Sequence, residues 1–116
     1  MFEKNLAVAE LLDSYAAVIS ERHRQLLDLY YNEDLSLGEI AAEVGISRQG
    51  VRDSIKKAEE ELFFFEERLH LAARARAVEK AGAALLEKTK DTPDLHAAAL
   101  ALLAAAGLSD ENEGDA

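Results

Sequence analysis

The sequence contains no cysteine and no tryptophan, and it has only one proline. Without cysteine the chain can form neither a disulfide framework nor a thiolate metal site, and it has no thiol nucleophile. Its three histidines, His23, His70 and His96, are scattered, and none has a partner at the spacing of a metal site. The sequence also lacks a glycine-rich phosphate-binding loop and a catalytic constellation. We therefore expect no metal, no cofactor and no catalytic residues.

Long hydrophobic runs are missing as well. The longest, Ala97 to Leu108, has twelve residues, whereas a membrane-spanning helix needs roughly 18 or more. The first fourteen residues mix Glu3, Lys4 and Glu10 into an apolar stretch, which is unlike the layout of a signal peptide. We expect a cytoplasmic protein that does not bind a membrane.

Positive charge is scarce, because 13 basic residues stand against 23 acidic ones and give a net charge of −10. Affinity for nucleic acid in general depends on neutralising phosphates, so this total argues against non-specific binding. Residues 35–58 are the exception, since their four basic and three acidic side chains give a net charge of +1. Any contact with nucleic acid is expected in this segment.

Long stretches of Ala, Leu, Glu, Lys and Arg with little alternation predict an all-α chain. A first helix is expected from about Asn5 to Ile19. Ser20 is a suitable N-cap for a second helix from Glu21 to about Tyr31. The apolar side chains that these helices direct toward a core are Val8, Leu11, Leu12, Tyr15, Ile19, Leu26, Leu27, Tyr30 and Tyr31.

The next segment has the layout of a helix-turn-helix. Ser36 and Glu39 have the spacing of a capping box, which starts a short third helix. Gly45 can end that helix in the left-handed conformation, and Ser47 can cap a fourth helix two residues later. A short helix, a glycine turn and a capped second helix predict a wingless helix-turn-helix domain extended by C-terminal helices.

The outward face of the fourth helix carries basic and amide side chains near its start. Arginine can recognise guanine and glutamine can recognise adenine in the major groove, and a recognition helix makes these contacts from its N-terminal turns. The alternative is that the face is polar only because it is exposed to solvent. The candidate nucleic-acid-binding residues are Arg48, Gln49, Arg52 and Lys56.

The opposite face of this helix is apolar, at alternating spacings of four and three residues. It consists of Val51, Ile55, Ala58, Leu62, Phe65 and Leu69. Beyond Leu69 the apolar positions shift, so either the helix breaks between His70 and Ala73 or the apolar stripe moves around it. The acidic runs 59–61 and 66–67 are predicted to be a solvated face rather than catalytic carboxylates.

The C-terminal part is predicted to contain a last helix. Thr92, Pro93 and Asp94 are a strong start signal for it, and Gly107 follows its expected end at Ala106. The expected domain organisation is a helix-turn-helix domain (1–70), a C-terminal helical extension (71–108) and a disordered acidic tail (109–116).

Two apolar surfaces need a cover. Three consecutive phenylalanines span about 200° of a helix, so one core cannot easily cover all of them. The last helix has almost no charge and also requires burial. The last helix folding back, a second copy of the chain or a partner protein could supply the cover. Two-fold pairing is the commonest arrangement, because a patch is then buried against its own copy. We therefore expect a homodimer, with interface residues Phe63, Phe64, Phe65, Leu102 and Leu103.

The stretch LLDLYYNEDLSLGEIAAEVGISRQGVRDSIKKAEEEL, residues 26–62, resembles the YlxM family of small bacterial helix-turn-helix proteins. The family pattern is a YY-loop-SLGEIA stretch followed by SRQ, a small residue, V, then D and I. The resemblance extends from about Met1 to Leu71. Gly50 and Arg52 stand where the family more usually has alanine and an aromatic residue. The matching residues are Tyr30, Tyr31, Ser36, Leu37, Gly38, Glu39, Ile40, Ala41, Ser47, Arg48, Gln49, Val51, Asp53 and Ile55.

The resemblance implies an all-helical fold akin to the promoter-reading domain of sigma factors. It also implies a link to the signal recognition particle pathway, which gene neighbourhood suggests for the family. The favoured function is therefore a non-enzymatic regulatory or accessory protein, with DNA, RNA or components of the particle as partners. The alternatives are a DNA-binding transcription regulator and a protein-interaction adaptor in which the helix-turn-helix is only a scaffold.

Overall fold

The computed structural model describes residues 4–108, and every regular element in that part of the chain is a helix. The predicted all-α fold is confirmed. The contacts divide the chain into two units, Met1–Ala72 and Ala73–Ala116, and the predicted tail, 109–116, lies outside the described residues. In chain order the helices are α1 (Leu6–Tyr15), α2 (Glu21–Leu27), the π-helix η1 (Asp28–Asn32), α3 (Leu37–Val44), α4 (Arg48–Leu69), α5 (Leu71–Thr89) and α6 (Pro93–Ala105).

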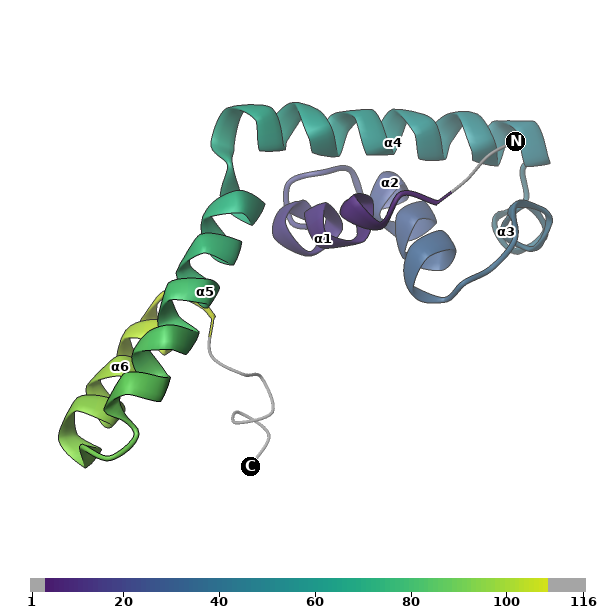
Figure 1. Ribbon diagram of the computed structural model, residues 1–116. Helices are drawn as coiled ribbons and strands as arrows, with labels where there is room; N and C mark the ends of the chain where they lie inside the picture. Colours follow the sequence, from purple (N-terminus) through teal and green to yellow (C-terminus); the bar gives the residue numbers. More distant parts are fainter. Residues whose placement is uncertain (1–3, 109–116) are drawn as a thin grey trace. The chain divides into compact units, whose positions relative to one another are not determined.

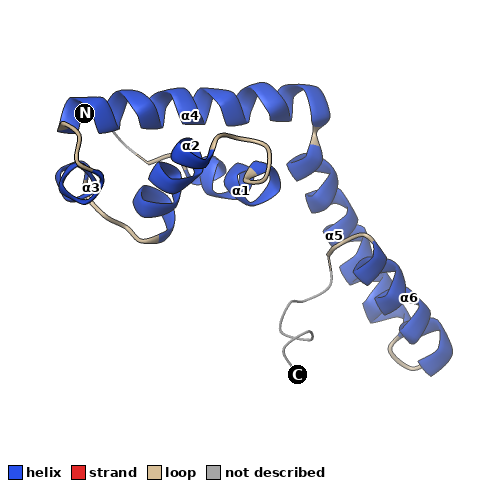
Figure 2. Ribbon diagram, turned by 180° about the vertical axis from the view of Figure 1, so that it is seen from behind, coloured by secondary structure: helices blue, strands red, loops and turns tan. Residues whose placement is uncertain are grey.

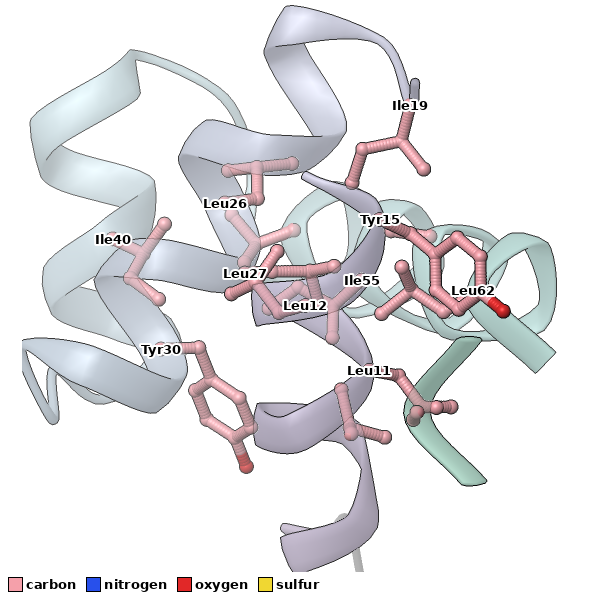
Figure 3. Packing of buried hydrophobic residues seen from close by; sticks show 14 of the residues in the cluster. Leu11, Leu12, Tyr15, Ile19, Leu26, Leu27, Tyr30, Ile40, Ile55 and Leu62 are labelled. Carbon is pink, nitrogen blue, oxygen red and sulfur yellow. The ribbon is translucent and has the colours of Figure 1, made fainter. Parts of the chain in front are cut away.

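The first unit is built against one face of α4. Helices α1, α2 and α3 all contact α4 and lie on the same side of it (Figure 1). Spacings of three and four residues keep the contacting side chains on one face. Side chains from the other helices converge on them (Figure 3). The fully buried side chains of α4, here called the inner stripe, are Val51, Ile55, Ala58 and Leu62.

The helix starts follow the local signals in the sequence. The Ser20 hydroxyl accepts a hydrogen bond from the His23 amide at 3.1 Å, and the Ser47 hydroxyl accepts one from the Gly50 amide at 2.9 Å. Ser36 and Glu39 satisfy each other's amides at 3.1 Å and 2.8 Å, so the predicted capping box is confirmed.

Two helix ends differ from the prediction. α1 ends at Tyr15 rather than near Ile19, although Ile19 is buried as expected. α2 changes at Asp28 into a single π-helical stretch, in which the Glu33 amide donates to the Asp28 carbonyl at 3.0 Å. This five-residue step is wider than an α-helical turn. Tyr30 is nonetheless buried, as its place in the sequence predicted.

Of the two alternatives left open by the sequence after Leu69, the structure shows the helix break, at His70, which adopts a left-handed conformation with φ 56°. Polar side chains satisfy the first amides of α5. The Tyr15 hydroxyl donates to Glu66 at 2.6 Å and accepts from the Leu71 amide at 3.0 Å. Glu66 also accepts from the Ala72 amide at 3.0 Å. A side chain from α1 and one from α4 therefore fix the point where α5 begins.

The prediction that the glutamates of α4 form a solvated face is wrong for three of the five. Glu66 belongs to the network at the start of α5. Glu61 lies 2.9 Å from Nδ1 of His23 on α2, and Glu59 accepts a hydrogen bond from the Tyr31 hydroxyl. These carboxylates lie at the edge of the inner stripe, where neighbouring helices can reach them. Leu69, the last residue of the predicted apolar face, is 45% exposed.

In the second unit, α6 packs on the part of α5 that follows Ala72 (Figure 2). Gly82 allows the close approach, because a methyl group there would lie 2.5 Å from Cδ2 of Leu103. Pro93 occupies the first turn of α6 as predicted, although the Thr92 side chain makes no capping hydrogen bond. No helix within residues 4–108 combines the length and the apolar character that a membrane span requires.

The inner stripe leads to a first prediction, on stability. Ile55→Ala is expected to lower the free energy of unfolding by about 2–5 kcal/mol, because it opens a cavity in a fully buried site. Leu69→Ala removes a similar volume from the exposed end of α4, and it should cost less than about 1 kcal/mol. Urea denaturation followed by circular dichroism measures both. Equal losses for the two variants would contradict this assignment of the buried face.

Candidate nucleic-acid interface

The turn between α3 and α4 has the geometry that its sequence predicted. Gly45 ends α3 with φ 78° and ψ 31°, the left-handed conformation that glycine adopts without strain. The amides of Gly45 and Ile46 both donate to the Ala41 carbonyl, at 2.9 Å and 3.2 Å. Ser47 then caps α4, so this helix begins directly after the turn.

Arg48 lies in the first turn of α4 and is exposed. Its side chain passes over the start of α3, because a methyl group added to Gly38 would lie 3.7 Å from Arg48 Nε. The two helices of the motif therefore present their N-terminal ends close together, with the guanidinium beside them. A charged group in this position can contact a phosphate or a base edge.

Gln49 is engaged within its own helix. Its side-chain amide donates to Asp53 at 2.9 Å, one turn further along α4. A bidentate contact with adenine needs both the carbonyl and the NH₂ group of glutamine in the plane of the base. The bond to Asp53 uses one of the two N–H donors of this amide, so a contact with adenine requires the other N–H and the carbonyl to face the base. The sequence placed both residues on this face, but their pairing was not predicted.

Further along α4 the surface becomes mixed in charge. Arg52, Lys56 and Lys57 are exposed. Asp53 and Glu60 join the two lysines around a shallow depression. The basic candidates are therefore exposed along α4, and two carboxylates lie among them.

The residues predicted as a protein interface do not share one environment. Phe65 is half-buried and stacks on Tyr15 with ring centroids 5.9 Å apart. Phe63 and Phe64 are 42% and 50% exposed, so the core does not cover all three rings, as predicted. In the second unit, Leu103 is buried at 8% exposure.

Sequence reasoning missed a polar cluster beside the inner stripe. The Tyr31 hydroxyl accepts from the Asn5 amide at 3.1 Å and donates to Glu59. Burial raises the pKa of Tyr31, and it also raises the pKa of Glu59, with the charge of Glu60 adding to the second effect. Tyr31 and Glu59 are far apart in the sequence, so no local pattern could have revealed the pair. Among the described residues, no group of three His, Asp or Glu side chains could hold a metal ion.

Comparison with known proteins places this arrangement in a family. Residues 2–99 match the model of the UPF0122 family, described as "Putative helix-turn-helix protein, YlxM / p13 like". The chain belongs to this family. The resemblance to YlxM proteins noted from residues 26–62 is thereby confirmed.

Several members of the UPF0122 family are similar to this chain. UPF0122 protein BH2485 of Halalkalibacterium halodurans is 39% identical over 104 residues, which cover 90% of this chain and 92% of the relative. A UPF0122 protein of Clostridium kluyveri is 41% identical over 78 residues, covering 67% and 70% of the two chains. UPF0122 protein Teth514_1714 of Thermoanaerobacter sp. is 48% identical over 64 residues, covering 55% of each.

The Tyr31–Glu59 pair leads to a second prediction, on pH. The raised pKa means that the folded state holds the Glu59 proton more tightly than the unfolded state does. The stability that Glu59 contributes is therefore complete below its ordinary pKa of 4.5 and is lost as the pH rises through the raised value. Glu59→Gln does not titrate, so the stability of the variant relative to the parent should rise with pH over the range that begins at about 4.5.

Urea denaturation at several pH values within this range measures the difference. Glu43→Gln, which removes the same charge from an exposed position of α3, serves as the control. If the stability of Glu59→Gln relative to the parent stays constant or falls with increasing pH, burial does not determine the pKa of Glu59.

Proposed function

We propose that this protein is a non-enzymatic regulatory or accessory protein that binds nucleic acid with the N-terminal turns of α4. The proposal rests on the position of Arg48 and Arg52. Both are exposed on the helix that follows the capped helix-turn-helix turn. Burial of the inner stripe of the same helix fixes its rotation. A rigid helix with arginines in its first turns suits contacts with a groove and its phosphates.

The charge of the chain limits this binding to a small area. The net charge is −10, and Asp53 and Glu60 lie beside the basic residues. Favourable contacts come from a few side chains, while the rest of the molecule repels phosphate. The affinity should therefore fall steeply as salt increases, and non-specific binding should be weak.

The family resemblance supplies a biological setting for the proposal, the signal recognition particle pathway. This part rests on the resemblance alone, since the family description names only the helix-turn-helix. Under this proposal the ligand is the small RNA of the particle. Duplex DNA as the ligand would instead indicate a transcription regulator, and binding to neither would indicate a protein-interaction adaptor.

Charge substitutions at α4 provide a third prediction. Arg48→Ala and Arg52→Ala should each weaken binding by about 1–3 kcal/mol if the side chain contacts a base, and by less, with a smaller salt slope, if it contacts a phosphate. Asp53→Asn should strengthen binding, because it removes a negative charge from the contact area. Titrations at low salt with the particle RNA and with duplex DNA measure these changes.

Arg22→Ala is the matched control, since it removes the same charge from an exposed position of α2. His23, the next residue, contacts Glu61, which lies about 20 Å along α4 from Arg48. Losses of equal size at Arg22 and Arg48 would indicate attraction to the whole surface rather than a site on α4. Saturable binding to neither nucleic acid would leave only the adaptor function.

We also propose that the protein forms a homodimer through the second unit. An apolar depression between α5 and α6 is lined by residues with almost no polar surface: Ala77, Val78, Ala81, Gly82, Leu85, Leu102 and Leu103. Leu102 is 61% exposed, the largest exposure among the interface residues predicted from the sequence. Two helices alone bury few side chains, and a second pair would cover the remainder as a four-helix bundle.

Leu102→Glu is the fourth prediction and should convert the dimer to a monomer, because it places a charge in the apolar contact. Ala104→Glu adds the same charge about 200° around α6, and it should leave the dimer intact. Sedimentation equilibrium at micromolar concentration measures the mass. A parent chain that stays at 12.7 kDa under these conditions would refute the dimer.

A further inference from the structure

The outward face of α4 changes its chemistry at Glu60. Before this residue the exposed side chains are mainly basic, and after it they are aromatic and acidic. Glu60, Phe63, Phe64 and Glu67 follow one another at spacings of three, one and three residues. This spacing places all four on one stripe of the helix, on the side opposite the inner stripe. We refer to them as the acidic–aromatic stripe.

The two rings of this stripe are exposed, at 42% for Phe63 and 50% for Phe64. Phe64 meets Phe65 edge to face with centroids 5.8 Å apart, and Phe65 stacks on the buried Tyr15. The core therefore supports the aromatic surface from below. Carboxylates frame it, since Glu60, Glu66 and Glu67 line a shallow depression together with the two rings.

One cation already occupies this surface. The Arg68 guanidinium lies 3.8 Å from the centroid of the Phe64 ring, and its Nη1 is 3.7 Å from Glu67. The face of an aromatic ring attracts cations, and a flanking carboxylate strengthens the attraction. Arg68 thus shows, within the chain itself, which chemical group the surface accepts. A phosphate would meet carboxylates here and would be repelled.

We propose that the acidic–aromatic stripe binds a cationic amphipathic helix of a partner protein. Apolar side chains of the partner helix cover Phe63 and Phe64, and its lysines or arginines pair with Glu60 and Glu67. Anchors spaced at i, i+3, i+4 and i+7 are the pattern by which two helices recognise each other along one face. The rings supply buried area, and the carboxylates select a basic partner.

A second copy of the chain fits this surface less well. A two-fold contact centred on the phenylalanines would bring Glu60 of one copy against Glu67 of the other. Like charges facing each other at an interface disfavour pairing. The proposed nucleic-acid site lies near the start of α4 and the proposed protein site lies near its end. The two sites can therefore be tested separately.

A synthetic leucine–lysine amphipathic helix, labelled with a fluorophore, is the probe, and a leucine–glutamate helix of the same length is its counterpart. Anisotropy titrations with the full chain should show saturable binding of the lysine helix only. Phe63→Ser/Phe64→Ser should weaken this binding at least about tenfold, as expected for residues at the centre of an interface. Glu60→Lys/Glu67→Lys should weaken it similarly and should create affinity for the glutamate helix.

The control is Glu79→Lys/Glu87→Lys, which changes the net charge equally at exposed positions of α5. It should weaken binding less than about threefold. Equal effects of the two charge reversals would overturn the proposal, because they would indicate general attraction to an acidic protein. Unchanged binding after Phe63→Ser/Phe64→Ser would also overturn it, because the two rings would then take no part in the contact.

Two further readouts separate this site from the other proposals. Titration with nucleic acid should be unchanged in Phe63→Ser/Phe64→Ser, and a loss there would assign the rings to the nucleic-acid site instead. Sedimentation of the same variant should match the parent. Dissociation of a dimer by this variant would show that the stripe contacts a second copy, and the proposal would then fail.

Discussion

The first unit depends on the burial of the inner stripe of α4. Its side chains are completely covered, and three other helices supply the cover. Burying one face of a helix also fixes its rotation, so the same contacts decide which residues point outward. The direction of Arg48 and Arg52 is therefore a consequence of core packing. Local contacts around the arginines are not needed to orient the helix.

Much of this arrangement could be predicted because its signals are short in range. A serine before each helix and a glycine after α3 act within a few residues, and the spacing of apolar side chains acts within one helix. The polar network of Tyr15, Glu66 and Leu71 could not be predicted in the same way. It joins residues more than fifty positions apart, and a run of glutamates has the same composition whether or not neighbouring helices reach it.

In the candidate sites, too, local patterns could be predicted from the sequence, whereas specific contacts between side chains could not. Charge pattern placed the basic candidates on the outward surface of α4, but it could not show that Gln49 is held by Asp53. On α6 the spacing of apolar residues could not show which side chains are buried. The helix is apolar on all sides, so periodicity could not distinguish the buried Leu103 from the exposed Leu102. The close approach at Gly82, which fixes that choice, comes from packing against α5.

The unbroken length of α4 has a further consequence. No proline interrupts Arg48–Leu69, and its only glycine is in the first turn. About 20 Å separates its first turns from Phe63 and Phe64. An unbroken helix of this kind fixes the distance between its two ends. Ligands bound at the two proposed sites would be held at a constant distance and angle. Binding of one would then raise the effective concentration of the other only where the geometry of the two ligands matches that of the helix.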